Sequence, residues 1–154
     1  MPAVGVVGKD GKQIADIFLR MAGGKVCCYH ITDRQPIGPC VTVLVAAQAS
    51  PVLAGMVPRL KKGSFLIVNA DDKKIFPLLS QSEATLITYG FNSKTCVTAS
   101  SISEDGVQVC IQRTFTDESG GICLPQEFFV KASGGPRLVL AAATAWAVCG
   151  LQTK

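Results

Sequence analysis

The stretch Ala3-Val4-Gly5-Val6-Val7-Gly8-Lys9-Asp10-Gly11-Lys12-Gln13 decides how the rest of the chain folds. A short apolar run meets three glycines at three-residue spacing, and a lysine then opens a segment with helical periodicity. Glycine adopts positive φ and leaves room for a ligand against the backbone. A strand that turns through glycines into a helix directs free N–H groups, and the positive end of the helix dipole, at one point.

This strand-to-helix turn is a candidate phosphate site. Its residues are Gly8, Lys9, Asp10, Gly11, Lys12 and Gln13. Backbone N–H groups at a helix N-terminus bind phosphate, and Lys12 adds a mobile cation. The P-loop pattern has Ser or Thr after its lysine as a ligand for Mg²⁺, whereas this chain has Gln13. The residues alone support a phosphate site and a ligand-free turn equally.

Length and composition favour a single domain over residues 1–154. Hydrophobic residues make up 48% of the chain and charged residues 17%, so a sizeable core can form. The net charge of +4 comes from scattered lysines and arginines without interleaved aromatic residues, which disfavours nucleic-acid binding. The seven cysteines form no Cys-x-x-Cys pair, which favours buried thiols. Without a signal-peptide pattern or an apolar run of about 18 residues, we expect a cytoplasmic protein that binds no membrane.

The first half of the chain alternates strands with helices. We expect strands at residues 3–7, 25–32, 41–47, 64–69 and 84–89, and helices at residues 10–22, 50–62 and 71–81. Ser50 can cap the second helix, and Pro58 should kink or shorten it. Strands that alternate with helices predict a parallel sheet with right-handed crossovers.

The second half has a different pattern. Strand-like runs at residues 94–102, 107–114 and 122–130 are separated by turn residues, and Asp105-Gly106 marks a hairpin. We therefore expect an antiparallel extension of the parallel sheet. Residues 137–151 form an alanine-rich helix that is apolar around most of its circumference. Either the sheet buries this helix fully, or one face of it binds a second copy of the chain or another protein.

A second set of polar residues, Asn69-Ala70-Asp71-Asp72, follows the fourth strand. Ligands of open α/β sheets bind at the carboxyl ends of the strands, and the amide of Asn69 suits the edge of a purine. Asp71 and Asp72 favour a helix N-terminus, so capping is the simpler role for them. His30, at the end of a strand, is more readily explained by a hydrogen-bonded partner than by catalysis.

With these residues in view, the chain resembles the central, ATP-binding domain of the Mur ligase family. Gly5-Val6-Val7-Gly8-Lys9-Asp10-Gly11-Lys12 is similar to the family's phosphate loop, and Asn69-Ala70-Asp71-Asp72 to its Asn-x-Asp-Asp motif. Thr88-Tyr89-Gly90 and the alanine-rich final helix resemble two further family features, in the same order. The resemblance implies a P-loop-like, mostly parallel sheet with flanking helices and antiparallel strands. It also implies ATP as the ligand, with Asn69 and Asp72 at the adenine.

The chain departs from the family where the family holds Mg²⁺. Gln13 replaces the hydroxyl residue after the lysine, and Ser50-Pro51-Val52-Leu53 has Val and Leu where the family has an acid and a histidine. No counterpart of the family's glutamate is evident between Gly24 and Val41. Residues 132–138 lack the polar groups of the family's Gly-x-His-Asn-x-x-Asn segment, and the family's two flanking domains have no counterpart in this sequence.

These departures predict a protein without ligase chemistry, because Mg²⁺-assisted phosphoryl transfer needs the charge stabilisation that those ligands supply. We expect a non-catalytic nucleotide-binding relative of the Mur ligases, in a regulatory or assembly role. Two alternatives stay open. One is an active ATP-dependent ligase or ATPase that a partner chain completes. The other is an interaction module that binds no nucleotide.

Overall fold

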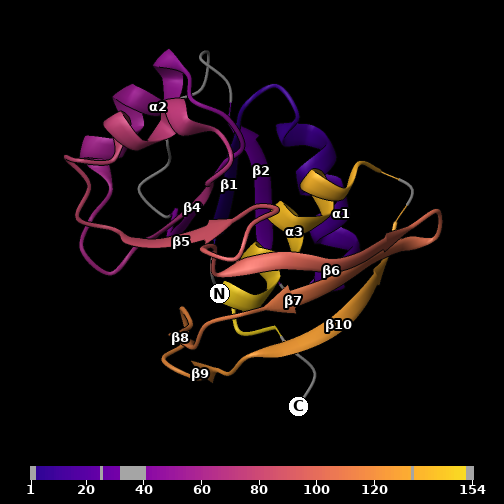
Figure 1. The fold of residues 1–154 in the computed structure, drawn as a ribbon. Coiled ribbons are helices and arrows are strands. Elements are labelled where there is room, and N and C mark those ends of the chain that lie inside the picture. The colour runs from indigo at the N-terminus through magenta and orange to yellow at the C-terminus, as the bar shows by residue number, and fades with distance from the viewer. Residues whose placement is uncertain (1–2, 25, 32–40, 133, 152–154) are drawn as a thin grey trace.

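The computed structural model describes residues 3–24, 26–31, 41–132 and 134–151. They form one eight-stranded sheet in the order β10-β7-β6-β5-β4-β3-β1-β2, together with a two-stranded ribbon of β8 and β9 (Figure 1). The strands are β1 (Ala3–Val7), β2 (Cys27–Ile31), β3 (Val43–Ala46), β4 (Phe65–Asn69), β5 (Thr85–Tyr89), β6 (Val97–Ser103), β7 (Gly106–Ile111), β8 (Phe115–Thr116), β9 (Ile122–Cys123) and β10 (Gln126–Lys131). The helices are α1 (Gly11–Ala22), α2 (Pro51–Met56), η1 (Val57–Arg59), η2 (Lys73–Leu78) and α3 (Pro136–Val148).

The strand directions confirm a mostly parallel sheet with an antiparallel extension. Within the series β2-β1-β3-β4-β5-β6, each strand is parallel to the next. The Asp105-Gly106 turn then reverses the chain, so that β7 is antiparallel to β6 and β10 is antiparallel to β7. The fold is therefore α/β, as the alternation of strands and helices predicts.

Helices cover both faces of the parallel strands because side chains on these strands are buried in both directions. Helices α1 and α3 pack on one face, where Ile14 and Phe18 meet Val4 and Leu140 in the larger core. Helices α2, η1 and η2 pack on the opposite face over Val7 and the facing side of β3 and β4. Helix α1 ends at Gly23, whose φ of 62° is the left-handed conformation that glycine adopts readily.

Two predicted helices differ in the structure. The segment predicted as a helix over residues 50–62 divides into α2 and the 3₁₀ helix η1, because Pro58 lacks an N–H group. Ser50 caps α2 as expected, and its hydroxyl accepts a 3.1 Å hydrogen bond from the N–H of Leu53. The helix predicted over residues 71–81 is instead the 3₁₀ helix η2, which contains Pro77. One predicted strand, residues 122–130, divides at Leu124-Pro125 into β9 and β10.

Helix α3 is buried by its own domain. The side chains that it buries lie all around the helix, from Val139 to Val148, and they belong to the core between the sheet and α1. The first of the two predicted environments, burial against the sheet, is therefore the one observed. A partner that docks on this helix would find little free surface.

The cysteines in the described residues are mostly shielded from solvent. Cys96, Cys123 and Cys149 are buried, and Cys28 is half-buried. Burial raises the pKa of the Cys28 and Cys96 thiols to about 11 and that of the Cys149 thiol to about 12, so these groups stay protonated at neutral pH. Cys40, the seventh cysteine, lies outside the described residues.

Candidate functional site at the carboxyl ends of the strands

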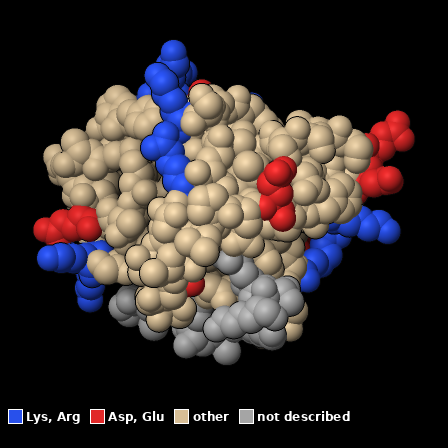
Figure 2. Space-filling model, turned by 60° about the horizontal axis from the view of Figure 1, so that its bottom comes forward, with Lys and Arg blue, Asp and Glu red and all other residues tan. Residues whose placement is uncertain are grey.

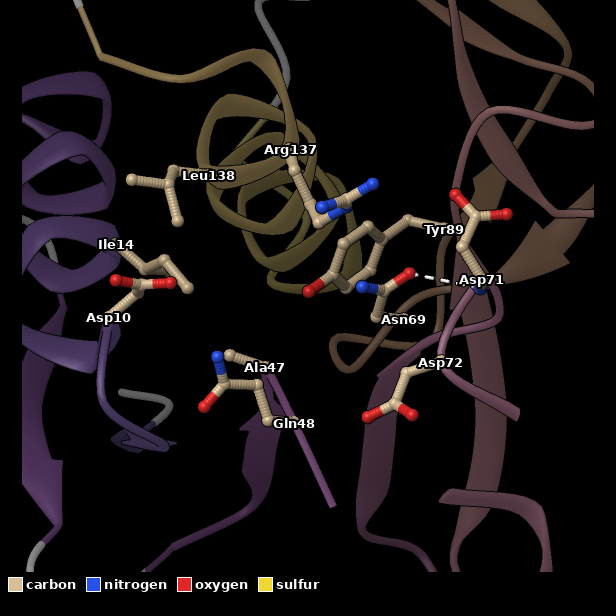
Figure 3. A pocket seen from close by; sticks show the side chains of 10 residues that line it. All are labelled: Asp10, Ile14, Ala47, Gln48, Asn69, Asp71, Asp72, Tyr89, Arg137 and Leu138. Atoms are coloured by element: carbon tan, nitrogen blue, oxygen red, sulfur yellow. Dashed lines mark hydrogen bonds between the residues drawn. The ribbon is translucent and has the colours of Figure 1, made fainter. Parts of the chain in front are cut away.

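The strand order fixes where a ligand can bind. From β1 the chain goes to β2 on one side, and β3 lies on the other side of β1. Ligands of open α/β sheets bind where the strand order reverses in this way, outside the carboxyl ends of the strands. A pocket of about 300 Å³ lies at this point (Figure 3). Its lining residues are Asp10, Ile14, Ala47, Gln48, Asn69, Asp71, Asp72, Tyr89, Arg137 and Leu138.

Asn69, the last residue of β4, presents a free amide to the pocket. Its side chain is only 5% exposed, and its Oδ1 accepts a 3.0 Å hydrogen bond from the N–H of Asp71. That bond orients the amide so that Nδ2 points into the pocket, and Nδ2 has no acceptor among the described residues (Figure 3). Nδ2 is open to the pocket, so it can donate a hydrogen bond to a bound ligand or to water.

Tyr89, the last residue of β5, presents a second such group. The residue is 1% exposed, and its hydroxyl points into the pocket without a hydrogen-bond partner among the described residues (Figure 3). Burial raises the pKa of Tyr89 well above its ordinary value, although the positive charge of Arg137 opposes this shift. The hydroxyl therefore stays neutral and can both donate and accept a hydrogen bond.

Asp71 and Asp72 line the pocket, but their carboxylates are already engaged. Asp72 accepts hydrogen bonds from the N–H of Ala49 at 3.1 Å and from that of Lys74 at 3.2 Å, so it caps η2 and ties β4 to the segment after β3. Asp71 accepts hydrogen bonds from the N–H of Phe91 at 2.8 Å and from Asn92 Nδ2 at 2.9 Å. The capping role favoured by the sequence is observed for Asp72. Both carboxylates hold the pocket wall in place.

Gly90 lies against Asp71, so a side chain at this position would disturb the pocket wall. Its φ is 156°, and a Cβ added there would lie 2.9 Å from Asp71 Oδ2. We expect Gly90→Ala to lower the free energy of unfolding by about 1–3 kcal/mol in urea titrations, because backbone strain adds to displacement of Asp71. Gly55→Ala is the matched control. It lies in α2 with open space around it and should raise stability by about 0.5–1 kcal/mol. Equal effects of the two changes would contradict this role of Gly90.

The glycine turn after β1 is held by side chains from neighbouring strands. The carbonyl of Gly8 accepts hydrogen bonds from the N–H of Gly11 and from Nε2 of His30, both at 3.0 Å. A Cβ on Gly11 would collide with the ring of His30, so glycine is required there. Lys9 donates its N–H to Gln48 Oε1 at 3.4 Å. His30 thus has the hydrogen-bonded role that the sequence favoured.

The pocket includes some of the residues predicted from the sequence and leaves out others. Asp10, Asn69 and Asp72 line it, whereas Gly8, Lys9, Gly11, Lys12 and Gln13 do not. Lys12 and Gln13 are exposed on the first turn of α1, next to Asp10. Their predicted contact with phosphate stays a prediction.

Three polar pocket residues, Gln48, Tyr89 and Arg137, were not among the site residues predicted from the sequence. Gln48 comes two residues after β3, and Tyr89 is the last residue of β5, as Asn69 is of β4. Arg137 follows the Gly-Gly-Pro start of α3, and its guanidinium carbon lies 5.5 Å from the ring centroid of Phe91. Each could have been found by its place at the end of a strand or the start of a helix.

Comparisons with known proteins assign neither a family nor a function to this site. No protein-family model matches the sequence, and no curated protein matches it. Within the described residues, no group of three or more His, Cys, Asp or Glu side chains is placed to hold a metal ion. Nor does any helix of the described chain combine the length and apolar character that a bilayer crossing needs.

Proposed function

We propose that this chain binds a nucleotide, with ATP as the first candidate, and that it does so without ligase chemistry of its own. The base lies in the pocket at the carboxyl ends of β1, β3, β4 and β5. The phosphates extend toward the N-terminus of α1. This proposal joins the resemblance to the Mur ligase central domain with the position of the pocket in the sheet.

The observation that carries the proposal is the pair of unpartnered polar groups in the pocket. Asn69 Nδ2 and the Tyr89 hydroxyl come from adjacent strands, are attached to side chains that are at least nine-tenths buried, and point into the same space (Figure 3). A purine edge carries acceptors and donors in one plane and would satisfy both groups. Ile14 and Leu138 supply apolar surface beside them.

The size and charge of the pocket suggest which part of the nucleotide it holds and which part lies outside it. A volume of about 300 Å³ is near the lower limit of ligand pockets, roughly 300–1,000 Å³, so it fits a base or nucleoside better than a whole triphosphate. Three carboxylates (Asp10, Asp71 and Asp72) against one guanidinium (Arg137) also make the pocket unfavourable for phosphate. Lys9 and Lys12 lie just outside it at the start of α1, where the helix dipole favours an anion.

Titration with ATP, ADP and AMP, with and without Mg²⁺, tests the proposal by calorimetry. Saturable binding without turnover supports it. Mg²⁺-dependent hydrolysis, tested also with added lysate proteins, would instead favour a ligase or ATPase that a partner chain completes. Failure of all three nucleotides to bind at millimolar concentration would contradict the proposal and leave a module that acts through protein contacts.

Lys12→Ala should distinguish the contribution of the phosphates to nucleotide affinity from that of the base. We expect it to weaken ATP binding by roughly tenfold and AMP binding much less, because the exposed ammonium lies near the terminal phosphates. Lys61→Ala, another exposed lysine before β4, is the control and should leave both affinities unchanged. Equal ATP affinity in the wild-type protein and in Lys12→Ala would show that the glycine turn does not hold the phosphates.

A further inference from the structure

Strand β10 forms one edge of the eight-stranded sheet, and no strand of the described chain pairs with its outer side (Figure 1). The direction of its backbone groups follows from the ladder with β7. Ala132 donates its N–H to Asp105 at 3.1 Å, in register with the β10–β7 pairs. Since residues alternate along a strand, Val130 and Phe128 also face β7. The main-chain N–H and C=O groups of Glu127, Phe129 and Lys131 therefore face outward.

These three outward-facing residues are complementary to the same three residues of a second copy of the chain. We propose that β10 pairs with β10 of a second copy of this chain, antiparallel about a two-fold axis at Phe129. In that register Phe129 faces Phe129 of the second copy, and Glu127 faces its Lys131. Every outward-facing residue meets another outward-facing residue, so each pair exchanges two main-chain hydrogen bonds. The two sheets join into one continuous sheet.

The exposed face of the strand supports this register through its charges. Glu127, Phe129 and Lys131 share one face, where Phe129 is 52% exposed. The two-fold pairing places a carboxylate opposite an ammonium twice and sets two aromatic rings against each other, and both kinds of cross-strand pair are stabilising. Glu127 Oε1 accepts a hydrogen bond from Ser100 on β6, so the carboxylate turns from β6 toward the edge when it pairs with the lysine of the second copy. Charges on an edge strand usually discourage pairing. Here registers centred on Glu127 or on Lys131 would set like charges opposite each other, whereas the register centred on Phe129 sets opposite charges together twice.

The opposite face of the strand supports the same pairing through apolar contact. A hollow of about 410 Å³ lies beside β10, between α1 and α3, and Ile17, Met21 and Trp146 line it. Phe128 closes one side, with its ring centroid 5.0 Å from that of Trp146. In the proposed register Phe128 faces Val130 of the second copy, so the second copy covers the hollow and extends the core.

Sedimentation velocity over a concentration series tests the proposal in the full chain. Wild-type protein should show a monomer–dimer equilibrium. Glu127→Lys and Lys131→Glu should each raise the dissociation constant by about tenfold or more, because each places like charges opposite one another twice. The double variant Glu127→Lys/Lys131→Glu should restore wild-type dissociation to within about threefold, since it keeps the pairing with the signs exchanged.

Phe129→Lys should leave only monomer, because it sets two ammonium groups face to face on the axis. Phe76→Lys is its control. Phe76 is 44% exposed in η2, away from the edge, and this change should leave the dimer intact. Circular dichroism checks that all variants are folded. A wild-type protein that is monomeric at every concentration, a dimer that survives Phe129→Lys, or a double variant that stays dissociated would each overturn the proposal.

Discussion

Phe18→Ala is expected to lower the free energy of unfolding by about 3–5 kcal/mol, as truncation of a buried aromatic residue does elsewhere. Phe18 is fully buried and lies on the face of α1 that packs against α3 and the sheet. The cavity left by the ring would lie in the larger of the two cores. Urea unfolding followed by circular dichroism measures the loss. Ile14 in α1 and Asp10 just before the helix line the pocket, so the same change should loosen one wall of it.

Leu19→Ala is the matched control for this change. Leu19 is next in the same helix but 36% exposed, so its truncation should cost less than about 1 kcal/mol. If the two changes lowered stability equally, α1 would not pack through the face that contains Phe18.

Asn69→Leu should give the largest loss of nucleotide affinity, about 10- to 100-fold, because the ligand would lose a donor and bury an unpaired acceptor. Leucine is close to asparagine in size, so the pocket keeps its shape. The change also removes the acceptor for the N–H of Asp71, and some loss of stability is expected. Gln81→Leu, at an exposed amide residue remote from the pocket, is the control.

Tyr89→Phe separates a loss of nucleotide affinity from a loss of stability. It deletes only a hydroxyl that has no partner among the described residues, so the free energy of unfolding should change by less than about 0.5 kcal/mol. Nucleotide affinity should fall by about 3- to 10-fold if the hydroxyl bonds to the ligand. An unchanged affinity in Tyr89→Phe, together with an Asn69→Leu effect no larger than that of Gln81→Leu, would show that nucleotide does not occupy this pocket.

Periodicity in the sequence predicted the strands and the long helices well. The buried runs around Val4, Leu44 and Ile67 are too apolar for surface loops, and they form β1, β3 and β4 as expected. The α-helix predicted over residues 71–81 does not form, because Pro77 lacks the N–H that an α-helix needs. The segment forms a 3₁₀ helix instead, and Asp72 caps its start.

The site was only partly predictable, because its parts come together through the strand order. The sequence placed Asn69 at the end of a strand, but it gave no order for the strands. That order brings Tyr89 beside Asn69 and sets Arg137 over the same pocket. The hydrogen bond from His30 to the Gly8 carbonyl likewise depends on β2 lying next to β1, which only the folded chain shows.

The surface agrees with the modest net charge of the chain. On the face shown in Figure 2, a column of basic side chains runs down from the upper edge, and acidic and basic side chains lie next to each other at the left edge. The basic side chains on this face stand in separate groups. A small pocket with basic residues beside it suits the single nucleotide that we propose as the ligand.

The side-chain amide of Asn69 gives the most direct measurement. In the uniformly ¹⁵N-labelled protein, its pair of NH₂ signals can be assigned by their loss in Asn69→Leu and followed during titration with AMP and ATP. We predict that this pair shifts saturably with the same dissociation constant as calorimetry gives, and that Tyr89→Phe weakens the response. Nucleotide binding that leaves the Asn69 amide signals unmoved, or no binding at all, would contradict the central claim.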